Sequence, residues 1–326
     1  MKRLLAAVAV VVLLAGYLAG AGAENAREAS PEARPANAEG KTAAKPAPSG
    51  LDPSLGGGKA PLPTTGRFRV FILSGQSNMV GQGEAKELTE VYRKPHDRIR
   101  IWCEGGWQYL VPSRRFGPEV GMAHELAKAW PDDTIGIIKV AIGGTGILAF
   151  VPDWSREQAD RTGDGWKGPI YKTIIRCYQA AKQAGGIELA GFVWKQGGKD
   201  AKSPDTAKEY LANLEKLVAG VRKDTGAADL PVFISTYMTR EELDKAAEDP
   251  STKALAQGRP GLVDVLKAQL DAPQKIPNVF TVVHGRLPLK PDGIHFNTEG
   301  QLTQGKLIAD AVVKYYKEKG AGAAAE

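Results

Sequence analysis

Five short apolar runs, each followed by an amphipathic stretch, constrain the fold of this chain more than any other feature. The runs are rich in β-branched and aromatic residues, as buried strands are. The first run begins at Phe68 and ends before Gly75. The other four span Thr134 to Ala141, Leu189 to Trp194, Val232 to Tyr237 and Val279 to Val283. The helical stretches run from Pro118 to Trp130, Pro169 to Gln183, Asp205 to Lys223, Leu262 to Leu270 and Thr298 to Lys317. This alternation predicts a three-layer α/β/α domain with a central parallel sheet of about five strands, and Ile99 to Trp102 can add a minor one.

The first run ends in a turn that contains a candidate nucleophile. Gly75 breaks the strand, and Ser77 follows at its carboxyl end. In open α/β sheets ligands bind at this edge, and a turn that opens a helix offers free backbone N–H groups. An ordinary strand-to-loop turn that contains serine fits the local pattern equally well, because glycine and serine are common turn residues.

A second motif near the end of the chain favours catalysis. Asp292 and His295 stand three residues apart, so one tight turn can present both side chains. The carboxylate would orient the imidazole, and the imidazole would deprotonate Ser77. The three residues therefore form a candidate serine hydrolase constellation. The α/β-hydrolase elbow Gly-x-Ser-x-Gly does not fit, because Met79 replaces its second glycine.

These motifs, Gly75-Gln-Ser-Asn-Met and the late Asp-x-x-His, resemble those of the SGNH (GDSL-like) hydrolase superfamily. Within it they are most similar to the sialate O-acetylesterase and acetylxylan esterase group of carbohydrate esterases. The resemblance runs from about Arg67 to about Lys317 and implies flavodoxin-like strand order. It also implies a serine esterase that removes O-acetyl groups from sialic acid or an acetylated polysaccharide through an acyl-enzyme, with no cofactor.

Two further loops complete the predicted site. By the same resemblance, Gly144 after the second major strand is the oxyanion-hole glycine, although glycines also serve an ordinary tight turn. The segment from Trp194 to Asp200 resembles the pattern Trp-x-Gln-Gly-Glu-x-Asp, so the Gln196 side chain is expected to join Gly144 and the Ser77 N–H in the oxyanion hole. Gly198 replaces the glutamate of that pattern. A non-catalytic carbohydrate-binding protein on a decayed esterase fold is therefore the alternative.

The substrate-binding candidates are Gln76, Asn78, Arg115 and Trp194. For Arg115 a solvated basic turn is an equally good interpretation. Trp154 and Trp166, in the long loop before Pro169, are expected to form a sugar-stacking lid. The remaining histidines, His96, His124 and His284, are interpreted as structural, with a place in the cleft left open for His284.

The chain divides into four predicted segments. Residues 1–23 have a basic start, an apolar core and the ending Ala21-Gly22-Ala23, which is typical of a secretory signal peptide. An uncleaved anchor is the rival interpretation. Residues 24–66 are rich in Ala, Pro and Gly and predict a disordered linker. The esterase domain is expected at 67–318, followed by a disordered tail at 319–326. The signal predicts export to the periplasm or beyond, without stable membrane association after cleavage.

The charge and the cysteine content of the chain limit the classes of partner and metal site that we expect. The formal net charge is +6 and includes Lys2 and Arg3, and no basic run interleaves with aromatic residues, so nucleic-acid binding is not expected. No His or Cys cluster has metal-ligand spacing, so no metal is predicted. Cys103 and Cys177 are interpreted as buried free thiols, with one disulfide as the open alternative. The expected partner is an acetylated carbohydrate, and the sequence does not indicate an oligomeric state.

Overall fold

The computed structural model describes residues 48–248 and 258–323. The predicted signal peptide, 1–23, and residues 24–47 of the predicted linker lie outside the described residues, as do 324–326 of the predicted tail.

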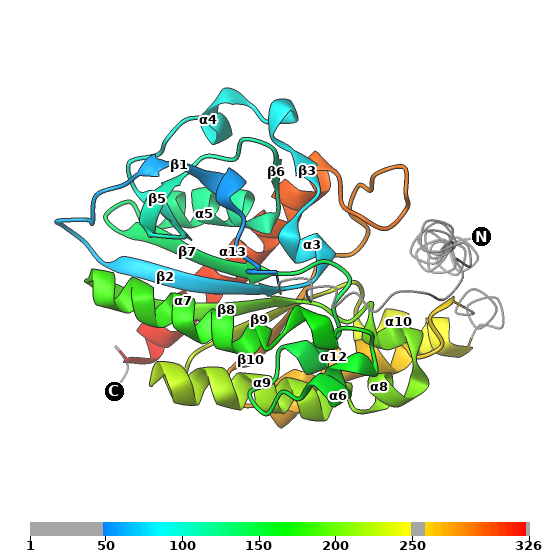
Figure 1. Cartoon of the computed structure of the whole chain (residues 1–326). Helices are drawn as coiled ribbons and strands as arrows, with labels where there is room; N and C mark the ends of the chain where they lie inside the picture. Colours follow the sequence, from blue (N-terminus) through cyan, green and yellow to red (C-terminus); the bar gives the residue numbers. More distant parts are fainter. Residues whose placement is uncertain (1–47, 249–257, 324–326) are drawn as a thin grey trace, which may run out of the picture.

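An eight-stranded sheet forms the centre of the molecule, with the strand order β1-β5-β4-β7-β2-β8-β9-β10 (Figure 1). The six strands from β4 to β10 in this order run parallel, whereas β5 and β1 are antiparallel to their neighbours. The strands are β1 (Gly56–Lys59), β2 (Phe68–Gly75), β4 (Ile99–Cys103), β5 (Gly106–Leu110), β7 (Thr134–Ala141), β8 (Ile187–Lys195), β9 (Val232–Thr236) and β10 (Val279–Val283).

The order of the five predicted strands confirms the flavodoxin-like fold. Numbered along the chain, β7-β2-β8-β9-β10 reads 2-1-3-4-5, with the order reversing around β2. The sheet is larger than the predicted five strands, because β4 pairs with β7 and a tight hairpin then returns the chain as β5. The short strand β1 has no apolar pattern, and its glycine-rich backbone pairs with β5 at the edge.

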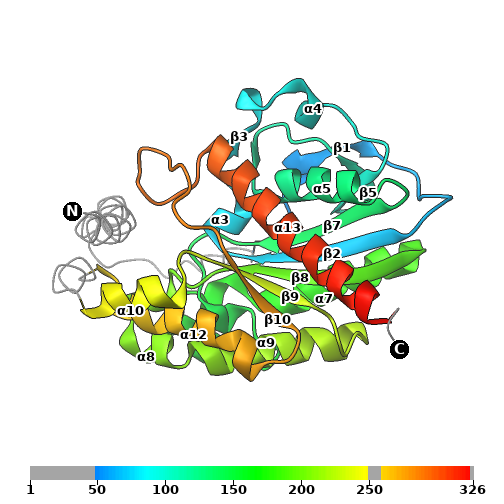
Figure 2. The same cartoon turned by 180° about the vertical axis from the view of Figure 1, so that it is seen from behind.

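Helices cover both faces of the sheet (Figures 1 and 2). One face carries α7 (Ile170–Ala184), α9 (Tyr210–Thr225) and α12 (Leu262–Lys275), and the other carries α5 (Pro118–Ala129) and α13 (Thr298–Ala323). Because successive side chains of a strand point to opposite faces of the sheet, each strand contributes to the core on both faces. In β2, Val70 and Ile72 join the first core, whereas Phe71 and Leu73 join the second.

Shorter elements connect these layers. They are α3 (Ser77–Val80), α4 (Glu90–Arg93), α6 (Arg156–Asp160), α8 (Pro204–Lys208), α10 (Arg240–Glu248), the strand pair β3 (Gly83–Glu84) and β6 (Arg115–Phe116), and 3-10 turns at Pro53–Leu55, Ala85–Glu87, Ile147–Ala149, Gly165–Lys167 and Asp200–Lys202. The predicted helix from Asp205 to Lys223 is two helices, α8 and α9, that meet at Glu209. None of the helices among residues 48–248 and 258–323 has the length and apolar character needed to cross a bilayer.

The predicted disorder of the linker 24–66 is wrong for its described part. Leu55 is almost completely buried, β1 pairs with β5, and the Gly50 carbonyl accepts a hydrogen bond of 3.0 Å from Ala141 N–H. Backbone pairing and one inserted leucine thus order a segment whose composition is poor in apolar residues. The predicted tail 319–326 is also wrong in part, because α13 continues to Ala323 in spite of the glycines at 320 and 322.

Candidate active site

Ser77 lies at the point where the strand order reverses. It is the first residue of α3, directly after β2, and the Gln76 N–H donates to the Lys195 carbonyl of β8 at 3.0 Å. Gly75 has a φ of 146°, and a Cβ there would lie 2.0 Å from the Lys195 carbonyl oxygen. Only glycine therefore lets the strand turn so close to its neighbour. The first N–H groups of α3 have no acceptor within the helix, which leaves the Ser77 N–H available.

Asp292 and His295 lie on one tight turn between β10 and α13. Asp292 Oδ2 accepts a hydrogen bond of 2.8 Å from His295 Nδ1, while Asp292 Oδ1 accepts from the N–H groups of Ile294 and His295. Burial alone would raise the pKa of Asp292, but these hydrogen bonds together hold the pKa below its ordinary value. The carboxylate therefore stays ionised and fixes the orientation of the imidazole.

Asn78 connects this turn to the serine. Its Nδ2 donates to the Ile294 carbonyl at 3.2 Å, and its Oδ1 accepts from the Phe296 N–H at 3.1 Å. These two contacts bracket His295 and bring it beside α3. The side chain is buried and engaged with the chain, which contradicts the predicted substrate-binding role of Asn78. Within the described residues, Ser77 Oγ and His295 do not hydrogen bond, and catalytic hydrogen bonds are often long or poorly aligned in ligand-free active sites.

The glycine turn after β7 forms the opposite wall. Gly144 has a φ of 58°, which favours glycine, and an added Cβ would meet no atom within 4 Å. The carbonyl oxygens of Gly143 and Gly144 accept hydrogen bonds from Lys167 Nζ at 3.1 and 2.9 Å. In the part of the chain that the structure describes, the Gly144 N–H has no hydrogen-bond acceptor. This donor is therefore free for a substrate oxygen, and the oxyanion-hole role of Gly144 stays a prediction.

Gln196 does not take the predicted oxyanion-hole position. Its Nε2 donates to the Thr145 carbonyl at 2.8 Å and to Asp200 Oδ2 at 2.5 Å, which uses both amide hydrogens. Asp200 is fully buried and also accepts from the Ile147 N–H. Burial raises the pKa of Asp200 to about 7, against these hydrogen bonds. Gln196 and Asp200 thus hold the glycine turn through its Thr145 carbonyl and the following Ile147 N–H.

The other predicted substrate contacts differ in position. Trp194 is completely buried in the core, and its Nε1 donates to the Tyr210 hydroxyl, so the predicted contact with substrate is wrong. Arg115 is exposed on β6, where it hydrogen bonds Gln82, and it does not line the pocket at Ser77. Gln76 does line this pocket, and its Oε1 accepts from the N–H groups of Gly197 and Lys199.

The pocket at Ser77 has a volume of about 210 Å³. Its walls come from the segments that follow β2, β7 and β8, together with one residue after β9 and one after β10. They are Gln76, Ser77, Gly143, Gly144, Gly163, Asp164, Trp166, Lys167, Gly198, Lys199, Lys202, Arg259 and Ile294. Of the two tryptophans of the predicted lid, only Trp166 lines it. Lys199 and Lys202 follow β8, so the sequence could have placed them at this edge of the sheet. No sequence pattern marks Arg259 or Lys167 as pocket residues.

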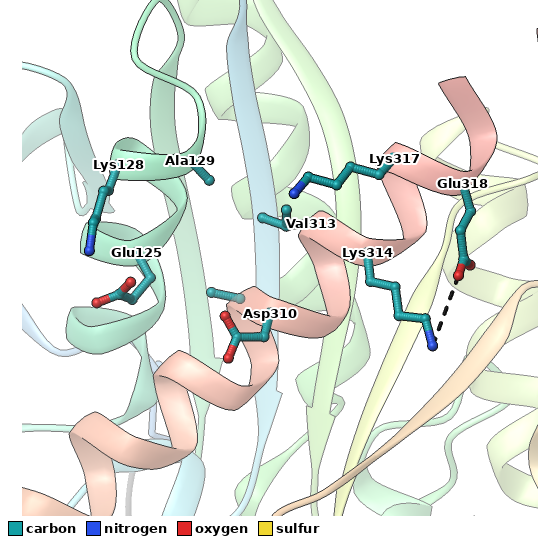
Figure 3. Close-up of a pocket in the computed structure, with 9 residues that line it drawn as sticks. Glu125, Lys128, Ala129, Asp310, Val313, Lys314, Lys317 and Glu318 are labelled. Atoms are coloured by element: carbon teal, nitrogen blue, oxygen red, sulfur yellow. Dashed lines mark ion pairs between the residues drawn. The ribbon is translucent and has the colours of Figure 1, made fainter. Parts of the chain in front are cut away.

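A larger cavity of about 670 Å³ lies away from Ser77, between α5 and α13 (Figure 3). Its walls are mainly charged side chains, such as Glu125 and Lys128 of α5 and Asp310 and Lys314 of α13, with an exposed ion pair between Lys314 and Glu318. It contains no serine, cysteine or histidine. The smaller pocket is therefore the candidate active site.

The remaining histidines do not line the pocket at Ser77 and pack against other side chains of the protein. His284 is buried, its Nε2 lies 2.9 Å from Lys195 Nζ, and burial lowers its pKa well below the ordinary value. His124 packs against Tyr92 and His96, and burial lowers its pKa to about 4.

Both cysteines are free and buried, so the alternative of a disulfide is excluded. Burial raises the pKa of Cys103 to about 11, which makes its thiol a poor nucleophile. No group of three or more His, Cys, Asp or Glu side chains within 48–248 and 258–323 is arranged to hold a metal ion.

Comparison with known proteins identifies the family of this chain. Residues 67–314 match the model of a family described as "Carbohydrate esterase, sialic acid-specific acetylesterase". A probable carbohydrate esterase of Arabidopsis thaliana is 25% identical over 288 residues, which cover 79% of this chain and 94% of that protein. The match confirms the family resemblance of the motifs.

Solved structures show the same fold. A protein from Arabidopsis thaliana superposes with a TM-score of 0.60 at 22% identity, covering 76% of this chain and 99% of that chain. The structure of NanS superposes with a TM-score of 0.54 at 15% identity, covering 79% of this chain and 100% of that one. At these identities the likeness concerns the fold alone.

Proposed function

The chain belongs to the sialic acid-specific acetylesterase family of carbohydrate esterases, and from this premise we propose that it removes O-acetyl groups from carbohydrate through an acyl-enzyme on Ser77. The protein is a carboxylic ester hydrolase. The observation that carries the proposed mechanism is the connection of the Asp292–His295 pair to the serine helix through Asn78.

The proposed reaction has two halves. Ser77 Oγ attacks the acetyl carbonyl carbon while His295 takes the serine proton. His295 then gives that proton to the sugar oxygen as the bond between this oxygen and the acetyl carbon breaks, so the sugar leaves with a free hydroxyl. Water next attacks the acetyl-serine, again losing its proton to His295, and acetate leaves as the serine is restored. The N–H groups of Ser77 and Gly144 supply hydrogen bonds to the oxyanion of each tetrahedral intermediate.

The pocket supports an acidic sugar as substrate. Of the residues that the structure describes, one carboxylate lines it, Asp164, which is paired with Lys167 at 2.6 Å, and the lining holds four basic residues: Lys167, Lys199, Lys202 and Arg259. A surplus of positive charge attracts a sugar that carries a carboxylate. Acetate release should therefore be faster from O-acetylated acidic sugars than from neutral ones of the same acetyl content, and equal rates across such a panel would contradict this choice of substrate.

Substitution Ser77→Ala tests the nucleophile. It should abolish acetate release from p-nitrophenyl acetate and leave the thermal unfolding temperature close to that of the parent. Wild-type activity in the variant would refute the mechanism.

Gly198 favours one alternative, a carbohydrate-binding protein without catalysis, because it stands where the related pattern has glutamate. Labelling with a fluorophosphonate separates the two functions, since only an activated serine reacts with it. Labelling of the wild type and its loss in Ser77→Ala supports the esterase, whereas sugar binding without labelling supports the alternative.

We also propose that the protein is exported, on the basis of the signal-like pattern of residues 1–23. The mature protein should begin at Glu24 in mass spectrometry of an exported, membrane-free fraction. Intact Met1 in the membrane fraction would favour the uncleaved anchor instead.

A further inference from the structure

Lys167 occupies an unusual position beside the glycine turn. Its side chain is 9% exposed, and its Nζ lies within hydrogen-bond distance of four oxygen atoms. These are Asp164 Oδ1 at 2.6 Å, Thr145 Oγ1 at 2.8 Å, the Gly144 carbonyl at 2.9 Å and the Gly143 carbonyl at 3.1 Å. An ammonium group has only three hydrogens, so its donor capacity is fully used. The contacts centre on the turn that carries the Gly144 N–H.

Peptide geometry links these contacts to the oxyanion hole. In a trans peptide the C=O of one residue and the N–H of the next point in opposite directions, and the described chain has no cis peptides. By holding the Gly143 carbonyl, Lys167 therefore turns the Gly144 N–H away from itself. Two adjacent glycines would otherwise allow this peptide to rotate, because no side chain restricts it. Rotation would present a carbonyl oxygen in place of the N–H donor.

Asp164 holds the lysine and the turn together. Its Oδ1 pairs with Lys167, and its Oδ2 accepts from the Gly146 N–H at 2.8 Å. Asp164 is 1% exposed. A buried ammonium without a partner is costly, so this carboxylate is what allows the charge to stay beside the turn. The charge also polarises the two peptides that it contacts, which strengthens their N–H groups as donors.

We propose that Lys167 is a positioning residue for the oxyanion hole, which keeps the Gly144 N–H turned toward the acetyl oxygen during attack by Ser77. The inference rests on the proposed function, since it concerns the same reaction. In this proposal Lys167 does not touch the reacting atoms and affects the rate only through the peptide that it holds.

The test compares Lys167→Met with Lys167→Arg in the full chain, using p-nitrophenyl acetate. Lys167→Met removes the hydrogen bonds but keeps most of the side-chain volume. Its kcat should fall about 10²-fold, the scale of losing one oxyanion donor, while KM stays within about threefold of the wild-type value. Lys167→Arg keeps charge and donors and should recover part of the lost kcat. Lys172→Met, an exposed lysine on α7 that does not line the pocket at Ser77, serves as the control and should match the wild type.

Two results would overturn the proposal. One is a kcat of Lys167→Met within about threefold of the wild-type value. The other is a raised KM with unchanged kcat, which would mean that Lys167 binds substrate. If Lys167→Met does not fold, Thr145→Val decides. The Thr145 hydroxyl accepts from the ammonium and itself donates to the Gly143 carbonyl at 3.1 Å, so its loss weakens the hold of Lys167 on the turn with little change of shape. The kcat of this variant should fall several-fold without a change of KM, and a wild-type kcat there would overturn the proposal as well. An inactive wild-type protein would instead refute the proposed function, so the two failures are distinguishable.

Discussion

The Asp292–His295 turn and the glycine turn at 143–145 meet at the same pocket, but the chain holds them in different ways. Asp292 and His295 have side chains that are 38% and 19% exposed, and they are tied to the serine helix by the two hydrogen bonds of Asn78. The glycine turn is held by Lys167 and Asp164 in the pocket wall and by Gln196 and Asp200 outside it, and all four are buried.

The difference matches what each side does in the proposed reaction. An oxyanion hole works because its dipoles are fixed before charge develops, so a rigid, buried support is an advantage. The acid–base side must accept and return a proton and must exchange water for sugar, which requires access to solvent. A carboxylate with a lowered pKa can orient the imidazole there without being buried. Substitutions of the acid–base pair itself should therefore act mainly on catalysis, whereas substitutions of the buried groups that support either turn should act on stability as well.

The largest expected effect is that of Asp292→Asn on turnover. In the described part of the chain, Asp292 is the only carboxylate that hydrogen bonds His295, and Asp200 is fully engaged with Gln196 and Ile147. Asparagine would favour the wrong imidazole tautomer, and kcat should fall by up to about 10⁴-fold, as in other triads with this change. Steady-state rates on p-nitrophenyl acetate measure it.

The control for Asp292→Asn is Asp244→Asn, at an exposed position on α10, which should keep the wild-type rate. Near-normal turnover of Asp292→Asn would show that another group orients His295. Adding Gly198→Glu to Asp292→Asn asks whether the glutamate of the related pattern can replace the missing acid.

Asp200→Asn tests the buried side through the pH dependence of stability. The folded state raises the pKa of Asp200 from 3.8 to about 7, so between these values it binds more protons than the unfolded state. The free energy of unfolding therefore falls as pH rises from about 4 to about 7, by up to about 4 kcal/mol for a shift of about 3 units. This contribution levels off only at about pH 8, one unit above the raised pKa.

The measurement is denaturant unfolding of both proteins between pH 4.5 and pH 8, a window chosen around the raised pKa. Asparagine does not titrate, so the difference between wild type and variant isolates Asp200. The wild type should lose stability relative to the variant as pH rises. Two parallel curves would mean that the pKa of Asp200 is the same in the folded and unfolded states.

Sequence alone predicted the five major strands, their order by family resemblance, and the residues Ser77, Gly144, Asp292 and His295 at one edge. These predictions rest on local patterns, namely alternating apolar runs, glycine turns and a spacing of three. Pattern could not predict β1, because its pairing partner β5 lies about fifty residues away in the chain. Pattern also does not show which way a side chain faces. The sequence therefore suggested a substrate contact for Trp194, which faces the core, and an oxyanion role for Gln196, whose amide donates to Asp200.

The roles of Lys167 and Asn78 depend on contacts between distant parts of the chain. Asn78 contacts residues 216 and 218 positions away. A residue adjacent to the proposed nucleophile is a reasonable candidate for substrate binding until the fold shows which backbone it contacts.

The smallest expected effect, and the sharpest test of the comparison, is that of Asn78→Ala. Its removal leaves the Ile294 carbonyl and the Phe296 N–H without partners, which costs about 1–3 kcal/mol of stability for each buried group left unpaired. Because the turn that carries His295 is held to α3 by this side chain, the imidazole should also lose its place beside Ser77. We expect kcat to fall by at most about 10²-fold, the scale of misplacing a catalytic group by about 1 Å. Arg115→Ala, at an exposed residue that does not line the pocket, is the matched control and should change neither property. If Asn78→Ala loses stability but keeps its kcat at temperatures well below unfolding, the acid–base turn positions itself without Asn78, and the proposed contrast between the two sides of the pocket fails.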